Sequence, residues 1–122
     1  MANPFVHAEL ATTNVAKAKA FYGKMFKWEF IDRPMHTPAG NYTMIEVGDG
    51  TGGGMMQQMI PGAGSAWMPY VYVKDVAAAT RKARKLRAKI CKGVTVVKGL
   101  GRFSIIVDPT GAMLGLWEPK RA

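Results

Sequence analysis

The chain of 122 residues contains only one cysteine, two histidines and eight acidic residues, against 17 basic ones. Because Cys91 is alone, no internal disulfide can form, and we expect it to be buried after the second predicted helix. No apolar run approaches the ~20 residues that a membrane-spanning helix needs. The N-terminus also lacks the basic and apolar segments of a signal peptide. We therefore expect a cytoplasmic protein with no membrane partner.

The net charge of +9 is concentrated in one part of the chain. Between Lys74 and Arg102 there are ten basic residues and a single acid, Asp75. A basic helix face is usually exposed to solvent, although it could also dock an acidic partner. No RNP sequence, zinc knuckle or helix-turn-helix pattern accompanies it, so a nucleic-acid partner is not expected.

The two halves of the chain match each other when the sequence is shifted by 61 residues, the difference between positions 68 and 7. The shift places Gly115 over Gly54 and Asp75 over Asn14. In each half an extended run ends at the Asn or Asp, and an alanine-rich helical pattern follows. Such a repeat indicates two copies of one unit. We place module one at about residues 1–60 and module two at about residues 66–122 of a single domain spanning 1–122.

The hydrophobic pattern of each half predicts the element order βαβββ, so we expect an α+β fold built from two such modules. The strands follow from alternation of period two and the helices from a 3.6-residue period, with Asn14 and Asp75 as N-caps. Module one is expected to have strands at 5–13, 28–33, 42–47 and 53–59, and a loop at 34–41 that exposes His36. Module two is expected to have strands at 68–73, 94–98, 103–107 and 113–117, and a helix with apolar positions Val76, Ala79, Ala83, Leu86 and Ile90.

Two short motifs accompany the repeat. Ala18-Lys19-Ala20-Phe21-Tyr22, followed by Met25-Phe26, lies in the first predicted helix, and Asp108-Pro109-Thr110-Gly111 precedes the last strand. With these motifs the chain resembles, over its whole length, the vicinal oxygen chelate superfamily of glyoxalase I, bleomycin-resistance proteins and extradiol dioxygenases. The resemblance implies that each module curls into a half-barrel, that the two half-barrels line a cleft, and that the protein forms a homodimer.

The resemblance to glyoxalase I also implies four metal-ligand positions on the first and last strands of the modules. In this sequence those positions are His7, Gly54, Met68 and Gly115. Glycine has no side chain and a thioether binds Zn²⁺, Ni²⁺ or Mn²⁺ poorly, so only His7 qualifies. Glu9 could share the cleft with it, whereas alternation turns Gln57 and Glu118 to the opposite face. We therefore expect no metal and no other cofactor.

Strand alternation predicts which side chains line the implied cleft. The expected ligand-binding residues are Phe5, Met56, Met68, Tyr70, Tyr72, Met113 and Trp117. His7 and Glu9 are two residues apart on one strand, so they could serve as polar anchors or as a catalytic acid–base pair. A mostly apolar pocket with few polar groups suits a small flat organic ligand. The same side chains could also simply fill the core.

The leading functional prediction is metal-independent binding of a small apolar or aromatic molecule, as in the bleomycin-resistance proteins that the chain resembles. The alternative is an enzyme of the same superfamily with an atypical site, either a lyase or isomerase of glyoxalase type or a dioxygenase-like enzyme. In that case His7 and Glu9 would be catalytic. A third possibility is an interaction module that docks an acidic partner through the basic helix.

Overall fold

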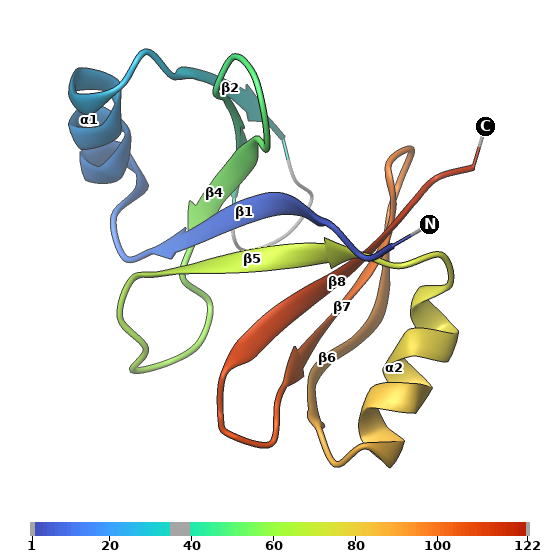
Figure 1. Cartoon of the computed structure of the whole chain (residues 1–122). Coiled ribbons are helices and arrows are strands. Elements are labelled where there is room, and N and C mark those ends of the chain that lie inside the picture. Colours follow the sequence, from blue (N-terminus) through green and yellow to red (C-terminus); the bar gives the residue numbers. More distant parts are fainter. Residues whose placement is uncertain (1, 35–39, 122) are drawn as a thin grey trace. The chain divides into compact units, whose positions relative to one another are not determined.

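The structure is a computed structural model that describes residues 2–34 and 40–121. Two helices and eight strands follow one another in the order βαβββ-βαβββ over these residues (Figure 1). The first five elements are β1 (Phe5–Thr12), α1 (Val15–Met25), β2 (Glu29–Arg33), β3 (Tyr42–Glu46) and β4 (Gly53–Gln57). The second five are β5 (Ala66–Tyr72), α2 (Val76–Lys85), β6 (Lys89–Val97), β7 (Gly101–Val107) and β8 (Met113–Pro119). The predicted α+β fold of two βαβββ modules is confirmed.

The chain forms two compact units whose limits differ from those of the predicted modules. Residues His7–Met68 make the N-terminal unit, and Pro69–Ala122 together with Met1–Val6 make the C-terminal unit. The first residues of the chain are held by β5, because the backbone N–H of Tyr72 donates to the Pro4 carbonyl at 2.9 Å. The Asn3 amide in turn donates to the Tyr72 carbonyl at 2.9 Å.

The residues at the boundary between the two predicted modules are held by the N-terminal unit in the same manner. The backbone N–H of Thr13 donates to Ser65 Oγ at 3.1 Å, and Trp67 Nε1 donates to the Tyr22 hydroxyl at 3.2 Å. Each unit therefore contains a short piece that the sequence repeat assigns to the other module.

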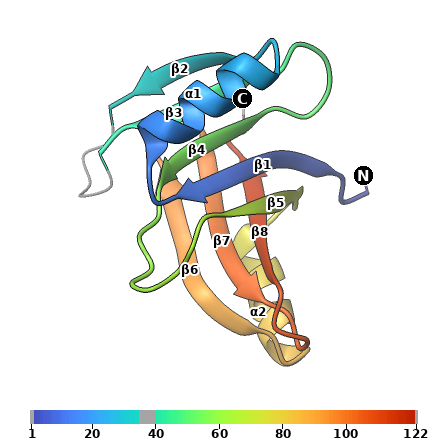
Figure 2. The same cartoon turned by 90° about the vertical axis from the view of Figure 1, so that its left-hand side faces the viewer.

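In the N-terminal unit the strands lie in the order β2-β3-β4-β1, and only the β1–β4 pair is parallel. Helix α1 lies against one face of this sheet (Figure 2). Leu10, Ile45 and Met55 form the core under the helix. Asn14 caps α1 as predicted, since its Oδ1 accepts from the backbone N–H of Lys17 at 3.0 Å.

The C-terminal unit repeats this plan in the order β5-β8-β7-β6, with β5 and β8 parallel. Val73, Val76 and Leu116 form its core beneath α2. Asp75 caps α2 as predicted, accepting from the backbone N–H of Ala78 at 3.1 Å. Neither helix of the part of the chain that the structure describes is long and apolar enough to cross a membrane.

Strand register confirms the 61-residue repeat in detail. Glu9 pairs with Gly54 across β1 and β4, and Tyr70 pairs with Gly115 across β5 and β8. Both members of the second pair are 61 positions beyond those of the first (70 − 9 and 115 − 54). The expected glycine positions are therefore structurally equivalent.

The second helix ends earlier than the sequence predicts. Leu86 is its C-cap, and Arg87 has a left-handed backbone with φ of 75°. Strand β6 then begins at Lys89, so Ile90 pairs with Ile106 in the sheet instead of extending the helical stripe. Leu86, predicted on the buried face, is 64% exposed. The helical spacing of Ile90 was coincidental.

The prediction that Cys91 is buried is wrong. Cys91 lies on β6, which ends the strand order of its unit, and its side chain is exposed. The register shifts between Ile90 and Lys92, which leaves Cys91 at an irregularity of the edge strand. His36, the other residue expected in a loop, lies outside the described residues.

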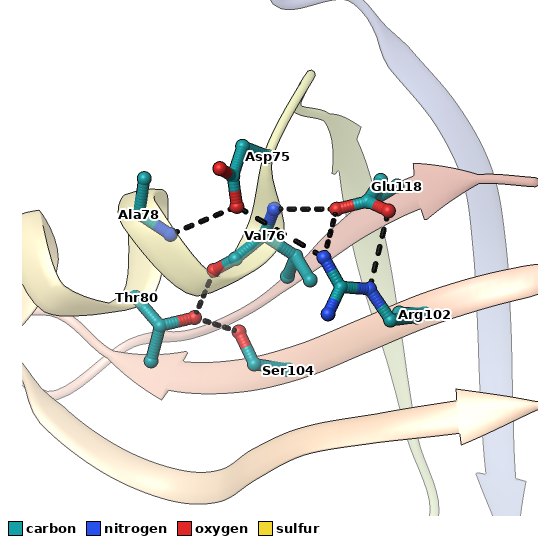
Figure 3. A network of polar contacts seen from close by, with 7 residues as sticks. All are labelled: Asp75, Val76, Ala78, Thr80, Arg102, Ser104 and Glu118. Atoms are coloured by element: carbon teal, nitrogen blue, oxygen red, sulfur yellow. Dashed lines mark hydrogen bonds and ion pairs between the residues drawn. The ribbon is translucent and has the colours of Figure 1, made fainter. Parts of the chain in front are cut away.

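A carboxylate on β8 fixes the start of α2 (Figure 3). Glu118 Oε1 accepts from the backbone N–H of Val76 at 2.9 Å and from Arg102 Nη2 at 2.7 Å, while Arg102 Nε donates to Oε2 at 3.1 Å. The Arg102 hydrogen bonds, followed by the bond from Val76, hold the pKa of Glu118 below its ordinary value. Glu118 therefore acts as a second cap beside Asp75.

A buried hydroxyl pair lies one turn further along α2. Thr80 Oγ1 donates to the Val76 carbonyl at 2.6 Å and lies 2.8 Å from Ser104 Oγ on β7. Both residues are buried, so the pair supplies partners for polar atoms that would otherwise be costly inside the unit. The contact with Ser104 joins α2 to the sheet, while the bond to Val76 lies within the helix.

We predict that Glu118→Gln lowers the free energy of unfolding by about 1–3 kcal/mol, because an amide replaces an ionised acceptor. The contribution of ionised Glu118 is present above 4.5, the ordinary pKa of the group, and is lost as pH falls through its lower folded pKa. Urea unfolding at neutral and acidic pH measures both effects. Glu46→Gln, at an exposed position on β3, is the control and should have little effect. Equal losses for the two variants would contradict this role.

Candidate functional site

The sheet face opposite α1 carries the polar residues expected in the site. Glu9 pairs with Gly54, and Gly54 pairs with Met44, so these residues share one face. Alternation adds His7, two residues before Glu9, and Tyr42, two residues before Met44. Met56, predicted to bind ligand, lies on the same face and is half-buried.

His7, Tyr42 and Glu9 form a continuous hydrogen-bonded chain. The Tyr42 hydroxyl donates to Glu9 Oε1 at 3.0 Å and lies 2.7 Å from His7 Nε2. His7 Nε2 is 3.9 Å from Glu9 Oε1, so the hydroxyl bridges the two ionisable groups. The His7 and Tyr42 rings are also stacked, with centroids 6.4 Å apart.

Burial sets the charge state of His7. The side chains of His7 and Glu9 are 24% and 15% exposed. Burial lowers the pKa of His7 below 6.5, which keeps the imidazole neutral at neutral pH. Because the Tyr42 proton goes to Glu9, the His7 Nε2–H must donate to the Tyr42 oxygen, and the basic lone pair of the ring is then on Nδ1.

The ring of Tyr42 occupies the space beside Gly54. A Cβ atom built on Gly54 would overlap the Tyr42 hydroxyl and neighbouring ring carbons. Glycine is therefore required at this position, because the aromatic ring lies directly on its backbone.

The C-terminal unit has the same arrangement at the equivalent place. A Cβ atom on Gly115 would overlap the ring carbons of Tyr70. Tyr70 contacts Phe103 edge to face, with ring centroids 6.2 Å apart. Phe103 and Tyr70 are the 61-residue equivalents of Tyr42 and Glu9, so an aromatic pair replaces the polar pair of the other unit.

The residues at the four family metal positions do not form a suitable donor set. His7 supplies an imidazole and Met68 a thioether, while tyrosine rings cover Gly54 and Gly115. No group of three or more His, Cys, Asp or Glu side chains within residues 2–34 and 40–121 could hold a metal ion. Gln57 and Glu118 make other contacts, to the Thr13 carbonyl and to the start of α2 respectively.

The remaining predicted ligand-binding residues differ in exposure. In the C-terminal unit, Tyr72 pairs with Trp117, and both are half-buried on the sheet face that also carries Tyr70. Tyr70 is only 5% exposed, whereas Met113 and Phe5 are 38% and 64% exposed. Met68, in the N-terminal unit, is half-buried.

Tyr42 is the site residue that the sequence reasoning missed. Its signal was present, because Tyr42 begins the third strand and matches Phe103 in the repeat. The pairing of Met44 with Gly54 is what brings its ring beside the last strand of the module.

Comparison with known proteins places the chain in a family. Residues 5–116 match the Glyoxalase/Bleomycin resistance protein/Dioxygenase superfamily. The protein belongs to this superfamily, and the resemblance found in the sequence is confirmed.

Curated relatives are similar over nearly the whole chain. The proteins named "Putative glyoxylase CFP32" of Mycobacterium bovis and Mycobacterium tuberculosis are 33% identical over 117 residues. The aligned part is 93% of this chain but 44% of each relative, so the chain spans about half the length of the curated relatives it matches.

Solved structures agree on the fold. The hypothetical protein BH1468 of Bacillus halodurans has a TM-score of 0.76 at 11% identity and covers 100% of this chain and 98% of its own. Methylmalonyl-CoA epimerase of Mycobacterium tuberculosis has a TM-score of 0.72 at 15% identity, covering 96% of this chain and 88% of its own. At these identities the likeness shows the fold alone.

We predict that Gly54→Ala and Tyr42→Ala are strongly non-additive. Alanine at position 54 should displace the Tyr42 ring, so its cost should fall by about 0.5–3 kcal/mol when Tyr42 is already truncated. Urea unfolding of the two single variants and the double variant measures this coupling. Gly64→Ala is the control, since nothing lies within 4 Å of the added atom. Additive effects would contradict the close contact.

Proposed function

We propose that this protein binds a small apolar or aromatic molecule without a metal ion, on a helix-free sheet face. The observation that carries the proposal is the tyrosine ring lying on each family glycine, Tyr42 on Gly54 and Tyr70 on Gly115. Aromatic rings thereby occupy the space where side chains at two of the family's metal-ligand positions would lie. Apolar sites with a few placed polar groups are typical of small-molecule binding.

On the N-terminal unit, the His7–Tyr42–Glu9 chain offers polar anchors for a ligand. A neutral imidazole and a carboxylate joined by one hydroxyl can meet either a donor or an acceptor on a ligand. On the C-terminal unit, Trp117 and Tyr72 offer half-buried aromatic surface for stacking.

We expect an aromatic ligand to quench the fluorescence of Trp117. Trp117→Ala should weaken binding about three- to tenfold, because one stacking partner contributes roughly 0.5–1.5 kcal/mol. Trp67→Phe is the matched control, since Trp67 lies with Trp28 and Tyr22 in a separate aromatic cluster beside α1. If Trp67→Phe abolishes the response while Trp117→Ala leaves the affinity unchanged, the ligand binds elsewhere.

An acid–base enzyme, a lyase or isomerase of glyoxalase type, is the second candidate. It is favoured by one observation, the hydroxyl bridge between a neutral His7 and the Glu9 carboxylate. Neutral His7 could remove a proton from a carbon beside a carbonyl group, and the hydroxyl and carboxylate would orient the ring.

This enzyme candidate predicts exchange of an acidic C–H proton with solvent. Deuterium uptake by a panel of thioesters and α-hydroxy ketones in D₂O, followed by NMR, tests it. The rate should fall as pH drops through the lowered pKa of His7, because the protonated ring cannot act as a base. His7→Gln should abolish exchange, and Lys85→Gln, on the exposed side of α2, should not. If no compound in the panel takes up deuterium, the enzyme candidate is wrong and the proposed binding function remains.

We also propose that the protein is a homodimer. Helix α1 has no buried residue over its whole length, and Phe21 and Met25 on it are 56% and 55% exposed. Apolar surface of this kind marks association sites in many proteins. Sedimentation equilibrium tests the proposal, since a monomeric mass would exclude it.

A further inference from the structure

A cavity of about 360 Å³, broadly open to solvent, lies between α2 and the strands on the helix side of the C-terminal unit's sheet. Ala79 and Ala83 line it from the helix, and Val71, Ile106 and Leu116 line it from the strands. Tyr70 and Trp117 are on the opposite face, because they alternate with Val71 and Leu116 along β5 and β8. This cavity is therefore separate from the proposed site on the helix-free face.

The cavity has a local structural cause. The start of α2 is fixed to the sheet by Glu118 and by the Thr80–Ser104 contact (Figure 3). Further along the helix, Ala79 and Ala83 face the cavity with methyl groups, and the C-cap residue Leu86 lines its end. Short side chains there leave room for a ligand between the later part of the helix and the strands, on the side that is open to solvent.

The charge around the cavity is of one sign. Lys82 contributes to its lining, and Lys82, Arg84 and Lys85 are the basic residues of the last turn of α2. The nearest acid on the helix, Asp75, is at the other end as the N-cap. No ion pair involving Lys82 is found among the residues that the structure describes. A ligand with an anionic head would complement this charge.

We propose that this cavity binds a medium-chain carboxylate. The aliphatic chain lies between the two alanines of α2 and the apolar strand residues, and the carboxylate meets the ammonium group of Lys82. The volume is within the range of about 300–1,000 Å³ typical of small-molecule pockets, and the lining is apolar except for Asn3 and one cation, Lys82. This ligand class differs from the flat aromatic molecules proposed for the other face.

Titration calorimetry with sodium decanoate, below the concentration at which it forms micelles, tests the proposal on the intact protein. We expect saturable binding of one decanoate per chain. Ala83→Leu should weaken it by at least about tenfold, because the larger side chain fills the cavity. Leucine is also a good helix former, so the variant should keep its fold, which circular dichroism and the unfolding midpoint check.

Two further comparisons test the role of charge. Lys82→Met keeps the length of the side chain and should weaken decanoate binding about three- to tenfold, while binding of uncharged decan-1-ol is unchanged. Lys85→Met is the matched control, because Lys85 is in the same turn but does not line the cavity. The proposal is overturned by absence of saturable binding, by unchanged affinity in a folded Ala83→Leu variant, or by equal effects of the two lysine substitutions. The Ala83 and Lys82 substitutions lie in the other unit from His7, so binding at the His7 site should not change. Failure of the decanoate proposal would therefore not contradict the proposed function.

Discussion

Close contact between a tyrosine ring and a glycine backbone constrains the helix-free sheet face of both units. No side chain fits at Gly54 while Tyr42 lies on it, and none fits at Gly115 beneath Tyr70. The two glycines occupy positions where the family resemblance implies metal ligands. The packing of a tyrosine ring on each glycine thus provides aromatic surface, and it excludes any side chain that could donate a metal ligand at that position. Next to Gly54 on the N-terminal unit's face, His7 and Glu9 are joined through the hydroxyl of the same Tyr42.

Most of the fold was predictable because it depends on periodicity and on the repeat. Alternation of apolar and polar residues predicted the strands. The 61-residue repeat predicted both helix caps and the matching glycines. The end of α2 was not predictable, because Arg87 adopts a left-handed conformation that residue preferences assign to glycine or asparagine. Ile90 then satisfied the helical period by chance. The exposure of Cys91 depends on an irregularity in an edge strand, which no local pattern encodes.

The candidate site was predictable only in part, since it combines one strand's alternation with the register between strands. His7 and Glu9 could be paired from their spacing alone. Tyr42 comes from another strand, and its position over Gly54 follows from the Met44–Gly54 pairing. Strand alternation predicts which face of the sheet a side chain lies on, but it does not predict which groups that side chain contacts there. Glu118, a carboxylate near the end of the chain, serves α2 as a cap instead of serving a site.

The exchange of short segments between the two units bears on how the gene could have arisen. The N-terminal residues around Pro4 bond to Tyr72, and Ser65 and Trp67, at the boundary between the predicted modules, bond to Thr13 and Tyr22. Neither half of the gene therefore encodes all the contacts of one unit. An ancestral half-length chain could have completed them only by trading these segments with a second copy of itself. Fusion of two such genes would have turned an intermolecular exchange into an intramolecular one, and made assembly independent of protein concentration.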